Sequence, residues 1–176
     1  MKKPVLFIFS ALFIMAVLSG CSASPKEELE EFHTDIKDNV AEPIFELAEG
    51  IEEKAVEFES GAISGDELIT YFEEDLQSVI DENRAYIQDY TEPGTEEAQE
   101  YYTALTDGMN MTLDILEKTS ELVVAMTDGD FDAMMTLGEE VDQMTGEMDE
   151  KSNKIEDLQK QYEEEFDAEF EEIEQL

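Results

Sequence analysis

Apolar side chains recur every three or four positions along almost the whole chain after residue 24. Charged and polar residues fill the positions between them, and runs of β-branched residues are absent. A repeat of three and four places the apolar side chains on one face of an α-helix. The pattern therefore predicts an all-α protein, with helices over about 25–60, 64–91, 95–127 and 130–176.

Residues that favour helix ends mark the boundaries between these segments. Ser24 and Ser64 are each followed three residues later by Glu, which is the pattern of a capping box. Thr95 and Asp130 are suited to cap the third and fourth helices, and Gly61 to end the first. Short connections favour antiparallel neighbours, and an apolar spacing of about 3.5 residues favours coiled-coil-like packing. The sequence therefore predicts an antiparallel up-down-up-down four-helix bundle.

Two of the predicted helices contain features that disturb a straight rod. Pro43 lacks an N–H and would clash with the carbonyl of Asn39, so we expect a kink in the first helix. The last helix would extend about 70 Å, so it must overhang the bundle, bend or break. Gly146 is the favoured weak point, because Ser152 and Asn153 follow it closely. We therefore expect a long, bent or broken last helix.

An overhanging last helix would leave part of its apolar stripe uncovered. If the segment after Lys154 overhangs, four large apolar side chains lack a partner within the chain. A long uncovered apolar stripe marks an interaction surface. We therefore expect a partner surface formed by Tyr162, Phe166, Phe170 and Ile173.

The N-terminal segment has a different pattern from the rest of the chain. Two lysines near the start precede an apolar run from Val5 to Leu18 that contains one serine. This is the pattern of a signal peptide, and the run is shorter than the ~20 residues of a spanning helix. The run ends in small residues immediately before the only cysteine of the chain, in the motif Leu18-Ser19-Gly20-Cys21.

This motif resembles the lipobox of bacterial lipoproteins, in which the Cys thiol is diacylglycerylated and the chain is cut just before it. The resemblance implies that residues 1–20 are a lipoprotein signal peptide and that Cys21 is the lipid anchor. Residues 21–24 are then the anchor and a short linker, and residues 25–176 are the helical domain. The whole pattern resembles small acidic helical lipoproteins of Gram-positive bacteria rather than a named family. It implies a location on the extracytoplasmic face of the cell membrane, with an envelope protein as partner.

Acidic residues dominate the charge of the chain. There are 48 Asp and Glu against 10 Lys and Arg, giving a formal net charge of −38. This charge repels phosphates, so the composition excludes nucleic acid as a partner and favours basic proteins. The acids lie off the apolar stripes, which indicates a solvated face that also suits a salty or alkaline habitat.

Side chains that commonly carry catalysis or bind metals are scarce. The chain has one Cys and one His, so a di-iron bundle with two Glu-x-x-His motifs is excluded. His33 is interpreted as a surface histidine, and Asn83, on an apolar stripe, as a residue that fixes helix register. Seven methionines between residues 109 and 148 favour core packing, and Met126 lies on a predicted stripe. No catalytic, cofactor-binding or metal-binding residue is assigned.

The sequence therefore predicts a membrane-anchored interaction module of the cell envelope that performs no catalysis and needs no cofactor. The alternative is an extracytoplasmic protein that binds or sequesters cations. It would use helix-face carboxylates for hard cations, or methionines for Cu(I). The sequence leaves the oligomeric state and the identity of the partner open.

Overall fold

Four helical rods make up the part of the chain that the structure describes. The structure is a computed structural model and describes residues 24–171 and 173. Every regular element among these residues is a helix, which confirms the predicted all-α class. The rods are, in chain order, α2 (Pro25–Ile36) with the π-helical η1 (Lys37–Ala41) and α3 (Glu42–Glu59); α4 (Gly65–Thr70) with the π-helical η2 (Tyr71–Leu76) and α5 (Gln77–Asp89); α6 (Glu96–Asp128); and α7 (Phe131–Phe166).

Three of the predicted helix caps are present. The hydroxyls of Ser24 and Ser64 accept hydrogen bonds from backbone N–H groups three residues on, at 3.2 and 3.3 Å. The Glu side chains at those positions accept from the serine N–H groups in return, so both capping boxes are confirmed. Asp130 caps α7 by accepting from the Ala133 N–H at 3.1 Å. Gly129, with φ of 71°, ends α6 in the left-handed conformation that glycine adopts without steric cost.

The start of α6 is capped from another rod. Thr95 precedes α6, as predicted, but its side chain caps no N–H of that helix in the described structure. Instead, the Glu28 carboxylate of α2 accepts hydrogen bonds from the N–H groups of Gly94 (3.1 Å) and Thr95 (2.8 Å). The Thr95 hydroxyl donates to the same carboxylate oxygen at 2.7 Å. A helix N-terminus favours negative charge, so the Glu28 carboxylate is favourable at this position. Its hydrogen bonds hold the α5–α6 connection against the first rod.

The first rod widens into a π-helical turn just before Pro43. In η1, the N–H of Glu42 donates to the carbonyl of Lys37, five residues back. The wider turn accommodates the proline ring and the carbonyl of Asn39, whose clash was the basis of the predicted kink. The similar segment η2 contains neither Pro nor Gly, and the sequence did not predict it.

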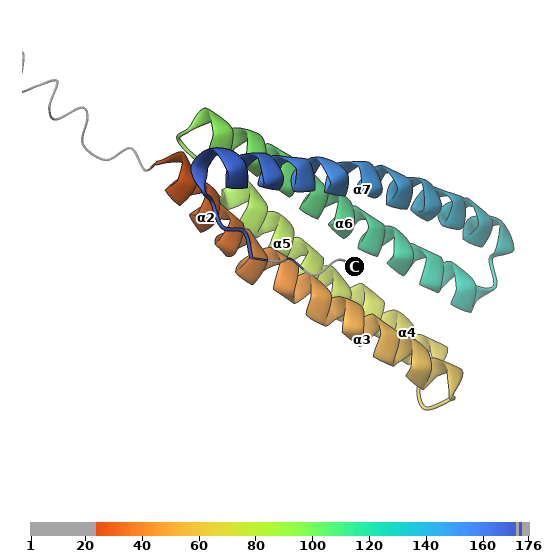
Figure 1. Cartoon of the computed structure of the whole chain (residues 1–176). Helices are drawn as coiled ribbons and strands as arrows, with labels where there is room; N and C mark the ends of the chain where they lie inside the picture. Colours follow the sequence, from red (N-terminus) through yellow and green to blue (C-terminus); the bar gives the residue numbers. More distant parts are fainter. Residues whose placement is uncertain (1–23, 172, 174–176) are drawn as a thin grey trace, which may run out of the picture.

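The fourth rod differs from the prediction. α7 is helical through Gly146 without interruption, so the predicted break there is wrong. The helix ends at Phe166, because Asp167 takes a left-handed φ of 58°. Residues 167–171 are not helical and turn back along α2 (Figure 1). The chain leaves the helix here because its last described residues find apolar and polar contacts on the first rod.

The rods pack unevenly along the molecule. α6 packs along α7 and also contacts α2, α4 and α5, whereas α7 contacts mainly α6 and, near its C-terminal end, α2. At the end farthest from the start of α2, the order of the rods is therefore α7, α6, α4 and α3 (Figure 1). The antiparallel four-helix bundle stays a prediction. The core draws on all four rods, and its most buried members include Leu29, Phe32, Ile36, Ile80, Tyr101, Leu105, Leu113 and Tyr162.

Candidate functional site

The partner surface predicted on the last helix packs against the chain itself. Tyr162 is buried in the core, and Phe166, Phe170 and Ile173 are half-buried against it. The expectation that these side chains lack a partner within the chain is wrong, because the chain turns back after Phe166. Polar contacts also hold the returning segment on the first rod, joining Lys26 to Asp167, Glu30 to Glu169 and Lys37 to Glu171.

His33 lies beneath the returning segment and is buried, so its interpretation as a surface histidine is wrong. Its Nε2 lies 2.6 Å from the Glu171 carbonyl and its Nδ1 2.7 Å from the Tyr101 hydroxyl. A carbonyl only accepts, so in the neutral ring Nε2–H donates to it and Nδ1 accepts from the Tyr101 O–H. The Tyr101 oxygen accepts in turn from the Gln159 side chain at 2.9 Å. Burial lowers the pKa of His33 below its ordinary value of 6.5.

We expect His33 to make the fold less stable as the pH falls below about 6.5. The unfolded ring takes up a proton near that pH and the folded ring only at lower pH, so protonation favours the unfolded state. The free energy of unfolding of the wild type, relative to that of His33→Gln, should therefore fall between about pH 7.5 and 5. Urea denaturation of both proteins across this range measures the difference. A difference that does not change with pH would contradict the role assigned to the neutral ring.

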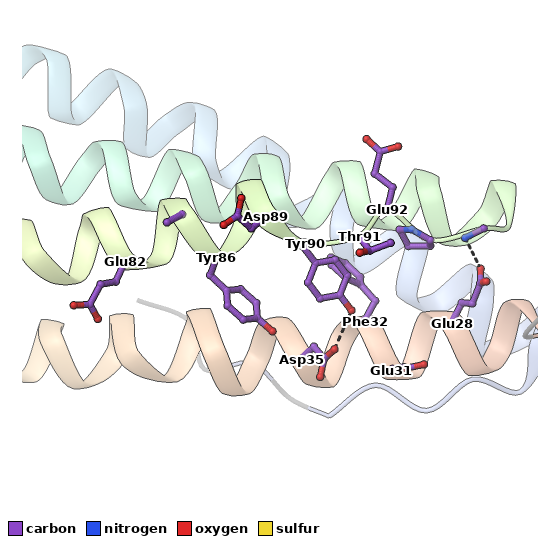
Figure 2. Close-up of a pocket in the computed structure, with 13 residues that line it drawn as sticks. Glu28, Glu31, Phe32, Asp35, Glu82, Tyr86, Asp89, Tyr90, Thr91 and Glu92 are labelled. Atoms are coloured by element: carbon purple, nitrogen blue, oxygen red, sulfur yellow. Dashed lines mark hydrogen bonds between the residues drawn. The ribbon is translucent and has the colours of Figure 1, made fainter.

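A cleft lies between α2 and α5, beside the α5–α6 connection (Figure 2). Its volume is about 710 Å³. Both helices contribute one face to it, and residues 90–94 close one end. The lining consists of Glu28, Glu31, Phe32, Asp35, Glu82, Ala85, Tyr86, Asp89, Tyr90, Thr91, Glu92, Pro93 and Gly94.

Aromatic rings form one part of this cleft. The ring of Tyr86, on α5, and that of Tyr90, immediately after α5, extend toward α2 (Figure 2), with their centroids 6.1 Å apart. The buried ring of Phe32 meets that of Tyr90 edge to face at 5.2 Å. The Tyr90 hydroxyl donates to the Asp35 carboxylate at 3.0 Å. Burial and this hydrogen bond raise the pKa of Tyr90, so the phenol stays protonated at neutral pH.

Carboxylates form the other part of the cleft. Six of the described lining residues are acidic and none of them is basic. Three of the acids, Glu28, Glu31 and Asp35, follow one face of α2 over about 10 Å. Asp89 and Glu92 lie at the rim and point away from α2 (Figure 2). The negative charge is thus distributed along the cleft. Aromatic faces and carboxylates both attract organic cations, so the arrangement is suited to hold an extended cationic group.

Residues considered for metal binding lie in different environments. Among the described residues, no group of three or more His, Cys, Asp or Glu is arranged to hold a metal ion. Met109 is buried, and Met148 accepts a weak hydrogen bond from Thr112. Met126 and Met135 are 55% and 69% exposed. The prediction that Met126 contributes to the core is therefore wrong.

Asn83 is buried, as its position on the stripe of the second rod predicts. Its Nδ2 donates to the Val79 carbonyl of the same rod at 2.8 Å. Its Oδ1 has no hydrogen-bond partner among the described residues. The role of Asn83 in helix register stays a prediction.

No family model, curated protein or solved structure matches the chain. Cys21 and the other residues of the predicted leader and lipobox lie outside the described residues. None of the described helices combines the length and the apolar character needed to cross a membrane.

Proposed function

We propose that this protein is a lipid-anchored, extracytoplasmic interaction module that binds a positively charged segment of an envelope protein. The cleft between α2 and α5 is the observation that supports this function, because its aromatic rings are combined with six carboxylates. Lys and Arg side chains fit such a lining through cation–π contacts and charge attraction. Since the carboxylates are distributed over about 10 Å, an extended segment suits the cleft better than a single metal ion.

The position of the cleft in the chain supports a partner at the membrane or in the cell wall. In this proposal two acyl chains at Cys21 give stable attachment. Only Ser22, Ala23 and Ser24 separate that cysteine from α2, and the cleft begins at Glu28 in the first turns of this helix. An anchored protein would therefore present the cleft close to the lipid headgroups. Repulsion between the acidic body and anionic lipid leaves the cleft accessible to basic partners.

Hydrogen bonds within the fold already engage several polar side chains that could take part in catalysis, which supports binding without catalysis. His33, the single histidine, is buried, and both of its ring nitrogens are hydrogen-bonded within the fold. The Asp35 carboxylate accepts from Tyr90, and the Glu28 carboxylate caps α6. We also propose that the rods pack as an antiparallel up-down-up-down bundle, supported by their short connections and the packing of α6 along α7.

Titration of the full chain with an extended Gly/Arg peptide tests this function. The double variant Glu31→Gln/Glu82→Gln removes two charges from the cleft, one on each helix. Exposed ion pairs contribute up to about 1 kcal/mol each, so we expect binding to weaken about tenfold. The variant Tyr86→Leu, which removes a ring but keeps an apolar side chain, should weaken binding several-fold.

The matched control is Glu73→Gln/Glu74→Gln, which removes the same charge from exposed positions of η2 outside the cleft. Its affinity should stay within about twofold of the wild type. Equal weakening in the two double variants would mean that net charge alone attracts the peptide. That result would refute the cleft as the site.

A further inference from the structure

Large exposed apolar side chains occur where α6 and α7 meet, at the end farthest from the start of α2. Met126, near the end of α6, is 55% exposed, and Phe131 and Met135, at the start of α7, are 74% and 69% exposed. The structure describes every residue from 131 to 154, and none of them is buried. In this region α7 has α6 as its neighbour, with the other rods on the far side of α6 (Figure 1). We refer to residues 119–150 as the distal hairpin.

Apolar side chains on the α7 part of the distal hairpin have the spacing of an amphipathic helix. Five side chains follow one another on α7 at intervals of three and four residues, and each is only half-buried against α6. Five of the nine methionines of the chain lie in this hairpin. Methionine is flexible and polarizable, so a surface rich in it adapts to the apolar side chains of a partner. We refer to these five residues of α7 as the methionine-rich seam: Met134, Leu137, Val141, Met144 and Met148.

The charged residues of the distal hairpin itself are all acidic. The distal hairpin contains ten Asp and Glu residues and no Lys, Arg or His. The nearest basic residues, Lys118 and Lys151, lie just outside it. They form ion pairs with Glu140 at 3.5 Å and with Asp107 at 3.9 Å. An apolar face bordered by carboxylates is complementary to a helix that carries apolar side chains on one face and basic ones on the other.

We propose that the distal hairpin binds a basic amphipathic α-helix of a partner protein. The apolar face of that helix packs on the methionine-rich seam, and its basic side chains meet the flanking carboxylates. α7 extends about 30 Å from Phe131 to Glu150, which matches a partner helix of about 20 residues. A second copy of this chain is disfavoured as the occupant, because it would bring the same negative charge to the surface. The surface is separate from the cleft, and the proposal does not rest on the function assigned to the cleft.

Calorimetry with the full chain in nonionic detergent tests the proposal. The probe is a Leu/Lys peptide of about 20 residues with helical amphipathic spacing, and a scrambled peptide of the same composition is its control. We expect the amphipathic peptide to bind at least about tenfold more tightly. With ¹³C-methyl-labelled methionine, the NMR signals of Met126, Met134, Met135, Met144 and Met148 should shift on binding, and that of the buried Met109 should not. Equal affinity for the two peptides would overturn the proposal.

Two matched variants separate this surface from other contacts. Met135→Ser removes a side chain that is 69% exposed on the distal hairpin, and Val56→Ser removes one that is 60% exposed on α3. We expect affinity for the peptide to fall about fivefold in the first variant and less than twofold in the second. An unchanged affinity of Met135→Ser would overturn the proposal, as would binding that only Glu31→Gln/Glu82→Gln weakens. Self-association that Met135→Ser abolishes would make a second copy the occupant and would also overturn it.

Discussion

Replacing Tyr101 with Ala is expected to lower the free energy of unfolding by about 4 kcal/mol. This value lies within the range of about 3–5 kcal/mol measured for replacing other buried aromatic residues with Ala. Tyr101 is fully buried, and its ring lies 5.1 Å from that of Phe170 and 6.5 Å from that of Tyr162. The ring therefore joins α6 to α7 and to the returning segment. Domains of this size are stable by about 5–15 kcal/mol, so the variant loses a large share of the total. Urea denaturation followed by circular dichroism measures the loss.

Two further variants separate the ring of Tyr101 from its hydroxyl. Tyr101→Phe keeps the packing but leaves Nδ1 of His33 without its donor, so we expect a loss of about 1–2 kcal/mol. Tyr86→Phe, at the edge of the cleft, should change stability by less than about 0.5 kcal/mol. If Tyr101→Ala cost no more than Tyr101→Phe, the ring would not have the central position that the structure gives it.

The beginnings and ends of the helices could be predicted from the sequence because local interactions determine them. The capping boxes at Ser24 and Ser64 involve residues three positions apart, so their pattern is visible in the sequence itself. The same holds for the Asp130 cap and for Gly129, whose left-handed conformation suits glycine. Thr95 shows the limit of this reasoning. Its position was correct, but the carboxylate that caps α6 belongs to Glu28, on a rod far away in the sequence.

The return of the chain after Phe166 could not be predicted from periodicity. Phe170 and Ile173 continue the helical spacing, yet the chain leaves the helix at Asp167 and packs these side chains against the first rod. This choice depends on contacts with α2 that have no signal in the local sequence. The burial of His33, in contrast, did have a signal in the local sequence. This residue lies four positions after Leu29 and three before Ile36, which places it on the apolar face of the helix.

The cleft also depends on a distant pairing of helices. The spacing of Glu28, Glu31 and Asp35 shows that these carboxylates share a face of α2, but an acidic helix face is most often simply solvated. Only the approach of α5 brings Tyr86 and Tyr90 to that face and turns it into an open, lined cleft. The candidate site is therefore a product of the tertiary fold.

Replacing Cys21 with Ser is expected to abolish lipid attachment completely. The resemblance of Leu18-Ser19-Gly20-Cys21 to a lipobox predicts that the Cys21 thiol receives the lipid, and serine offers no thiol. Expression of the full chain in a bacterial host fed an alkyne fatty acid, followed by fluorophore coupling and intact mass measurement, tests this. The wild type should carry the label and begin at Cys21, whereas Cys21→Ser should carry none and retain residues 1–20.

Ser22→Ala is the matched control, because it changes the neighbouring residue and leaves the thiol in place. It should be labelled and cleaved like the wild type. The mass of the mature wild-type protein gives an independent readout, since it includes the lipid only if Cys21 is modified. An unlabelled wild type with its leader intact would remove the anchor from the proposal. The proposed location at the membrane would then have no support. The binding experiments on the cleft and the distal hairpin do not depend on the anchor and would still test those two surfaces.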